Sequence, residues 1–100
     1  MKILHLNLRK NGFNYTQVLR NDKNAVYRQY VTPEIEYFEV FSIQIRPDIA
    51  FKGKLVTGGE SYPGNEAFGK TAWTFRSLEK AMIKYNSLPE WEQRTNPNIN

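Results

Sequence analysis

The chain of 100 residues contains no cysteine and only one histidine, His5. Without cysteine, a disulfide framework and a thiolate metal site are both excluded, and a reducing compartment such as the cytoplasm is permitted. A catalytic triad would have to combine His5 with one of a few scattered serines. We therefore expect a cytoplasmic protein that is not an enzyme and that holds neither a metal nor another cofactor.

Long apolar runs are also missing. The start of the chain, MKILHLNLRKNGF, alternates apolar and polar residues, which interrupts any signal-peptide core. No later stretch approaches the roughly 20 apolar residues that span a bilayer. We expect no export signal and no membrane partner.

The chain has a modest excess of positive charge. The net charge is +4, and the sequence pI is about 9.4. Each half of the chain carries seven Lys/Arg and five Asp/Glu, so no basic tail or arm stands out. The balance permits a nucleic-acid partner, but a charge that serves solubility is the preferred interpretation.

Alternation of apolar and polar residues predicts a meander of strands in the first half. The runs cover residues 4–9, 13–20, 25–31 and 35–45, and are separated by Asn11-Gly12, by the polar stretch 21–24 and by Pro33. In the second run, strict alternation places Leu19 on the face of Phe13 and Tyr15, with Arg20 on the other face.

The fourth run is apolar on both faces, which favours a central strand or one covered on both sides. One face carries Tyr37, Phe41, Ile43 and Ile45, and the other carries Phe38 and Val40. Glu36 and Glu39 fall on opposite faces, so they form no paired carboxylate site.

Residues 46–68 contain four of the six glycines and two of the five prolines, and show only short apolar islands at 49–51 and 55–56. We expect a long loop here, and long loops in small domains often carry specificity. A last short strand at 72–75 then leads into a helix.

Ser77 is a suitable N-cap for that helix, and Glu79 lies in the first turn, where the helix dipole favours a carboxylate. Helical spacing then directs an apolar stripe to the core, made of Leu78, Ala81, Met82, Tyr85 and Leu88. We expect the helix to end before Pro89 and residues 91–100 to form a polar tail that is either frayed or packed through Trp91 alone.

These patterns predict one α+β domain over residues 1–90. We expect an antiparallel meander sheet of four to five strands with one C-terminal helix packed on one face.

One stretch matches a phosphate-binding loop letter for letter: residues 64–71 read GNEAFGKT, as in G-x-x-x-x-G-K-[ST]. Gly64 and Gly69 would let backbone amides wrap the phosphates, Lys70 would reach the terminal phosphates and Thr71 would bind magnesium. That mechanism needs a buried strand before the loop and a helix at the lysine. Turn formers precede this loop and a strand follows it, so a glycine-containing connection is the preferred interpretation.

Aromatic and arginine residues are interleaved on the predicted strands, as on sheets that stack single-stranded nucleic acid. The candidates for such a platform are Arg20, Arg28, Arg46, Tyr27 and Tyr30. The same residues also suit core and edge packing or a protein interface.

The stretch GKTAWTFRSLEKAMIKY resembles the strand, cap and helix ending of small sheet-plus-helix modules, among them the WGR domain. The Trp-Gly-Arg signature of that module is absent, and the resemblance covers under a fifth of the chain and implies no residue roles. The abundance of Asn, Lys, Ile and Tyr resembles short basic proteins of bacteria, phages and mobile elements.

We expect a small non-enzymatic binding or regulatory module that acts on a macromolecule through the free sheet face or the 46–68 loop. The partner is a protein or a second copy of the chain, or alternatively single-stranded nucleic acid. Nucleotide binding through GNEAFGKT is a further alternative.

Overall fold

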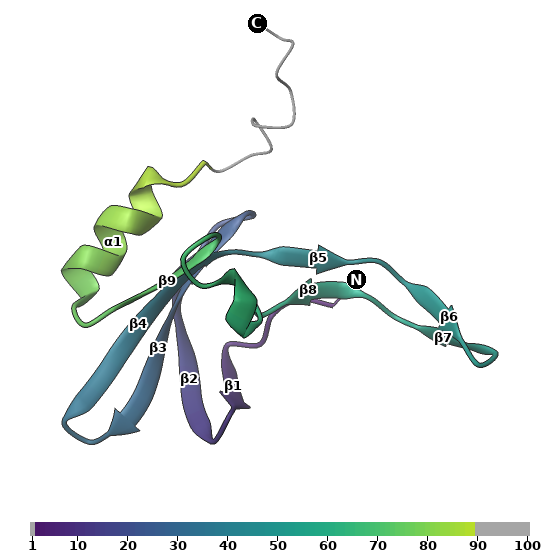
Figure 1. Cartoon of the computed structure of the whole chain (residues 1–100), viewed down its shortest axis with the longest axis horizontal. Helices are drawn as coiled ribbons and strands as arrows, with labels where there is room; N and C mark the ends of the chain where they lie inside the picture. Colours follow the sequence, from purple (N-terminus) through teal and green to yellow (C-terminus); the bar gives the residue numbers. More distant parts are fainter. Residues whose placement is uncertain (1, 90–100) are drawn as a thin grey trace, which may run out of the picture.

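The structure, a computed structural model, describes residues 2–89. Five strands form one antiparallel sheet in the order β1-β2-β3-β4-β9, and one C-terminal helix, α1, packs on one face of it (Figure 1). The predicted α+β meander is therefore confirmed. The strands are β1 (Asn7–Lys10), β2 (Phe13–Arg20), β3 (Asn24–Thr32), β4 (Ile35–Ser42) and β9 (Ala72–Phe75).

The turns have the chemistry that the sequence indicates. Asn11 and Gly12 join β1 to β2 with φ angles of 55° and 86°, both in the left-handed region of a tight hairpin. Between β2 and β3, the Asn21 side chain accepts hydrogen bonds from the amides of Lys23 and Asn24. Local polar residues thus fix the connections of the meander.

Three details of the predicted strands are wrong. The fourth run is not one strand over residues 35–45, because β4 ends at Ser42 and residues 44–46 pair in a separate sheet. The first strand begins at Asn7 rather than at residue 4, and Leu6 is exposed. The second strand contains a β-bulge between Gln17 and Leu19, which reverses the alternation of faces. Leu19 therefore packs beside the helix, away from Tyr15, while Arg20 turns to the opposite face.

The apolar character of β4 on both faces has a direct explanation, because the sheet has a core on each side. On the helix side, Phe38 and Val40 pack with Val26, Ala81 and Tyr85. On the other side the core is built around Tyr27 and Phe41 and is covered by residues that follow the 46–61 stretch; its members include Tyr15, Ala25, Tyr62, Ala67, Phe68 and Ala72.

Helix α1 (Leu78–Ser87) begins and ends where its capping signals place it. The Ser77 hydroxyl accepts a hydrogen bond from the Lys80 amide, and the chain becomes extended again at Leu88. Ala81 and Tyr85 are buried, and Met82 and Leu88 are packed against them. The exception to the predicted stripe is Leu78, the first residue of the helix, which is 37% exposed.

The stretch predicted to be a loop contains regular structure instead. It holds three short strands, β6 (Ile49–Phe51), β7 (Lys54–Val56) and β8 (Gly59–Ser61), and a 3-10 turn, η1 (Asn65–Ala67). A fourth short strand, β5 (Gln44–Arg46), precedes them at the end of the fourth predicted run and pairs with β8. The predicted polar tail, with Trp91, lies outside the described residues.

Candidate functional site: a projecting β-arm

Residues 44–61 form a two-stranded antiparallel arm that leaves the sheet and extends away from it (Figure 1). We call it the β-arm. Its inner part pairs β5 with β8, and its outer part pairs β6 with β7. At the tip, Lys52 and Gly53 have φ angles of 52° and 79°, which close a tight turn that resembles the one between β1 and β2.

Glycines allow close backbone approach at the junction between the inner and outer parts of the β-arm. A Cβ atom on Gly58 would lie 2.1 Å from the carbonyl oxygen of Arg46, so only glycine fits there. Gly59 faces the backbone of Lys2, with which it forms a parallel bridge. The Gly58 amide also donates to Asp48 Oδ1 over 2.7 Å, which links the two sides of the arm.

A bidentate ion pair fixes the β-arm to β2. The guanidinium of Arg20 donates to Glu60 Oε1 over 2.6 Å and to Oε2 over 2.8 Å. The same carboxylate accepts a 3.0 Å bond from the Leu4 amide. The Arg20 bonds hold the pKa of Glu60 below its ordinary value, so this carboxylate stays charged in the folded protein.

A second anchor, Tyr62, follows directly after β8. Tyr62 inserts its ring among Tyr15, Tyr27 and Phe41, with ring centres 4.5 to 5.5 Å away. Its hydroxyl donates a 2.6 Å hydrogen bond to the buried carboxylate of Glu39 on β4.

Burial shifts the titration of this cluster. It raises the pKa of Glu39, and the Tyr62 hydrogen bond and the Lys10 charge offset only part of that effect. Burial, together with Glu39, also raises the pKa of Tyr62, and burial raises that of Tyr15 to about 12. Lys10 Nζ lies 4.9 Å from the Tyr62 ring centre, as in a cation–π contact.

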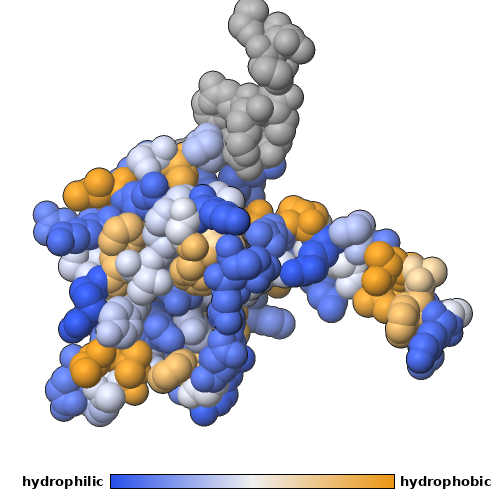
Figure 2. Space-filling view, viewed as in Figure 1, coloured by the Kyte–Doolittle hydropathy of each residue, from blue (hydrophilic) through white to orange (hydrophobic). Residues whose placement is uncertain are grey.

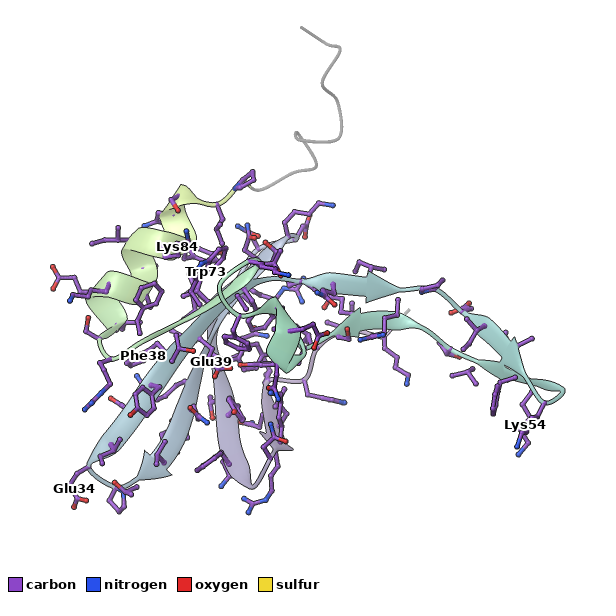
Figure 3. All side chains as sticks on the ribbon, viewed as in Figure 1. Glu34, Phe38, Glu39, Lys54, Trp73 and Lys84 are labelled. Atoms are coloured by element: carbon purple, nitrogen blue, oxygen red, sulfur yellow. The ribbon has the colours of Figure 1, made fainter. Side chains whose placement is uncertain are left out.

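Beyond these anchors the β-arm is exposed on both of its faces. Its large apolar side chains remain largely open to solvent in the described chain: Ile45, Ile49, Phe51, Leu55 and Val56 are 45% to 71% exposed. Figure 2 shows apolar patches along the arm, and Figure 3 places Lys54 at its tip. Exposed apolar side chains gathered on one element mark an interaction surface more often than scattered ones do.

The residues predicted to form a nucleic-acid platform do not come together. Tyr27 is fully buried, and its hydroxyl donates to the His5 carbonyl oxygen. Arg20 is engaged with Glu60, and Arg46 lies on the β-arm, where its Nε donates to Ser61 Oγ. The structure thus brings only Arg28 and Tyr30 of the five onto one open surface.

Arg28 and Tyr30 lie on the helix-side face of the sheet, on the half that α1 leaves open. The Arg28 guanidinium is 6.0 Å from the Tyr30 ring centre and 5.3 Å from that of Phe38. Its Nε lies 3.4 Å from a carboxylate oxygen of Glu36 on the next strand. Arg9 shares this half and donates to Asn14.

The GNEAFGKT stretch forms η1 and a turn that leads into β9, as the preferred interpretation expects. The amides of Lys70 and Thr71 both donate to the Ala67 carbonyl oxygen, and the Gly69 amide donates to that of Ala72. Gly64 faces the Glu66 carboxylate instead of open space. Lys70 and Thr71 are exposed, but the three amides that would wrap a phosphate are already bonded within the turn.

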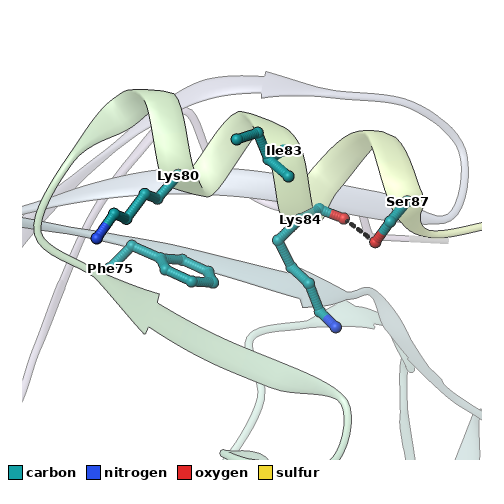
Figure 4. Close-up of a pocket in the computed structure, with 5 residues that line it drawn as sticks. All are labelled: Phe75, Lys80, Ile83, Lys84 and Ser87. Carbon is teal, nitrogen blue, oxygen red and sulfur yellow. Dashed lines mark hydrogen bonds between the residues drawn. The ribbon is translucent and has the colours of Figure 1, made fainter.

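A groove of about 310 Å³ lies between α1 and β9 (Figure 4). Its lining combines two apolar residues, Phe75 and Ile83, with Lys80, Lys84 and Ser87. The Lys84 ammonium also lies 4.0 Å from the centre of the Trp73 ring. This groove is separate from the β-arm.

Comparison with known protein families, curated proteins and solved structures finds no match for this chain. Among residues 2–89, no group of three or more His, Asp and Glu side chains could hold a metal ion. The one helix in this part of the chain is too short and too polar to cross a membrane.

Proposed function

We propose that this protein is a non-enzymatic binding module that engages a protein partner through the β-arm. The observation that supports this is the exposure of the large apolar side chains of the arm, with Phe51 at 58% and Leu55 at 71%. An isolated two-stranded hairpin is marginally stable in water, so a partner that covers these side chains would stabilise the arm. Aromatic and aliphatic anchors of this kind carry most of the binding energy in protein interfaces.

The anchors at the base fit this role. The Arg20–Glu60 ion pair and the Tyr62–Glu39 hydrogen bond fix the origin of the β-arm on the sheet. A recognition element on a rigid support loses less conformational entropy when it binds. The sheet and helix thus act as the scaffold, and the arm as the element that makes contact.

The test compares capture of proteins from a lysate of the encoding organism by three versions of the tagged chain. The arm variant carries Phe51→Ser and Leu55→Ser, and the control carries Ile83→Ser on α1, which is 65% exposed in the parent. We expect the arm variant to lose specific partners that the control retains. Equal capture by all three chains would exclude the arm as the binding element.

A second candidate is single-stranded nucleic-acid binding on the open half of the helix-side face. Arg28, with Tyr30 beside it and Arg9 on the same half, supports this candidate. Labelled oligonucleotides would be titrated by fluorescence anisotropy at two salt concentrations. Binding that falls steeply with salt and weakens in Arg28→Gln, but not in Arg46→Gln, would favour this surface. Binding that is absent, or that both variants weaken equally, would reject it.

A further inference from the structure

Strand β9 is one edge of the five-stranded sheet. The Ser42 amide donates to the Thr71 carbonyl oxygen, so every second residue from Thr71 onward bonds to β4. The amide and carbonyl of Thr74 therefore point away from the sheet, at an exposed position. Among residues 2–89, only the turn before β9 forms a backbone hydrogen bond on this outer side, and it reaches no further than Ala72. The backbone of β9 is thus open at Thr74.

The groove between α1 and β9 lies beside this open edge (Figure 4). Trp73 and Phe75 lie opposite Val40 and Phe38 of β4, so they project to the side of the sheet that α1 covers. The helix faces them with residues at the spacing i, i+3, i+4 and i+7, which share one side of a helix. These residues are Lys80, Ile83, Lys84 and Ser87.

Two ammonium groups and no carboxylate line this groove. Lys80 is exposed, and the Lys84 ammonium lies over the Trp73 ring of β9. Neither lysine forms an ion pair within the part of the chain that the structure describes. Phe75 and Ile83 add apolar surface next to the two charges. A ligand that is acidic and partly apolar would complement this lining.

From the open edge and the basic groove beside it, we infer that β9 and α1 form a second binding site, which takes an extended acidic segment of a partner protein as an added strand. The backbone of that segment would pair with the amide and carbonyl of Thr74. Alternate side chains of a strand point to one face, so residues two positions apart would enter the groove. The segment would place an apolar residue beside Phe75 and a carboxylate beside Lys84. This site is independent of the β-arm.

The same lysines disfavour a second copy of the chain as the added strand. If two β9 strands paired antiparallel, edge to edge, the two helices would lie on the same face of the joined sheet. Lys80 and Lys84 of each copy would then face those of the other. Lysine beside an exposed edge is one way in which proteins prevent such pairing. The charge that repels a second copy attracts an acidic segment.

The experiment selects peptides from a random library displayed on phage against the full chain. Selected peptides are then measured by fluorescence anisotropy against matched variants. Thr74→Pro removes the outward amide, and proline is tolerated at an edge position whose amide faces solvent. Thr74→Val keeps the amide and is its control. Lys80→Glu reverses one charge in the first helical turn, where a carboxylate is favourable, and Lys54→Glu on the β-arm is its control.

We expect the selected peptides to carry an apolar and an acidic residue two positions apart. Their affinity should fall by more than about tenfold in Thr74→Pro and in Lys80→Glu, and both controls should bind like the parent. Ile83→Ser should also weaken binding, because it removes apolar surface from the groove. If circular dichroism shows that Thr74→Pro is unfolded, Lys80→Glu still decides the outcome.

Three results would overturn the inference. The first is a selection that enriches no peptide, or only peptides without acidic residues. The second is a set of peptides that Phe51→Ser weakens and Thr74→Pro does not, which would place their binding on the β-arm and support the proposed function instead. The third is a parent that sediments as a dimer and that Thr74→Pro converts to a monomer, which would assign the edge to a second copy.

Discussion

The phenol of Tyr62 donates a 2.6 Å hydrogen bond to the carboxylate of Glu39, which joins the root of the β-arm to the middle of the sheet. Tyr62 follows β8 directly, and Glu39 is buried on β4. The arm is therefore held by a polar contact within an aromatic cluster. Buried contacts of this kind are costly to break because one partner is left unsatisfied.

Tyr62→Phe should destabilise the protein, because it removes the hydroxyl and leaves Glu39 buried without this donor. We expect the free energy of unfolding to fall by about 1–3 kcal/mol. Urea unfolding followed by circular dichroism measures this value. Tyr37→Phe is the control, since Tyr37 is half-buried and its ring lies beside Arg76, and it should change stability by less than about 0.5 kcal/mol. Equal effects of the two substitutions would contradict the role of this bond.

Glu39→Gln should change the dependence of stability on pH. The folded protein holds the pKa of Glu39 above its ordinary value of 4.5, mainly through burial. As pH rises above 4.5, the unfolded chain releases this proton before the folded one does, so the parent loses stability through this group. The variant has no such proton to lose. Its stability relative to the parent should therefore improve as pH rises.

Urea unfolding of both chains at about pH 4 and about pH 8 measures that difference. Glu60 acts in the opposite direction, because Arg20 lowers its pKa and its stabilisation is lost as pH falls. Both chains keep Glu60, so its contribution cancels when they are compared. A stability difference that stays constant between the two pH values would contradict a raised pKa of Glu39 in the folded protein.

Gly58→Ala should open the β-arm at the junction of its inner and outer parts, because the new Cβ would lie 2.1 Å from the Arg46 carbonyl oxygen. Gly53→Ala is the matched control: the tip has open space, and the substitution adds only the strain of a positive φ, roughly 1–2 kcal/mol. The reporter is hydrogen exchange of the Glu60 amide, which donates to the Lys2 carbonyl oxygen over 2.9 Å. We expect its protection to fall in Gly58→Ala and to persist in Gly53→Ala. The opposite pattern would show that pairing at Glu60 depends on the Gly53 turn and not on close approach at Gly58.

Local chemistry allowed much of the fold to be predicted. The helix was located by the Ser77 cap and Pro89, and the meander by period-two patterns and polar turns. The bulge in β2 could not be predicted, because no residue type in that stretch marks the extra residue. The bulge places Arg20 on the face of the sheet that Glu60 contacts, although Glu60 lies 40 residues further along the chain.

The candidate site was located only in part. The 46–68 stretch was expected to carry specificity, but its hairpin was missed because its Lys52-Gly53 turn is a weaker signal than Asn-Gly or Asp-Gly. The apolar islands on each side of that turn were the available sign of pairing. The Tyr62–Glu39 contact joins residues 23 positions apart, and local patterns contain no information about it.

The match of GNEAFGKT to a phosphate-binding loop leads to the last prediction. In this structure the Gly69, Lys70 and Thr71 amides already donate to carbonyl oxygens of the same turn. A phosphate could recruit them only by breaking three hydrogen bonds and the connection to β9, so we expect no binding of Mg-ATP or Mg-GTP. Isothermal titration calorimetry of the parent and of Lys70→Ala tests this expectation. Binding by the parent that Lys70→Ala abolishes would reverse it, and would show that the turn rearranges around the ligand.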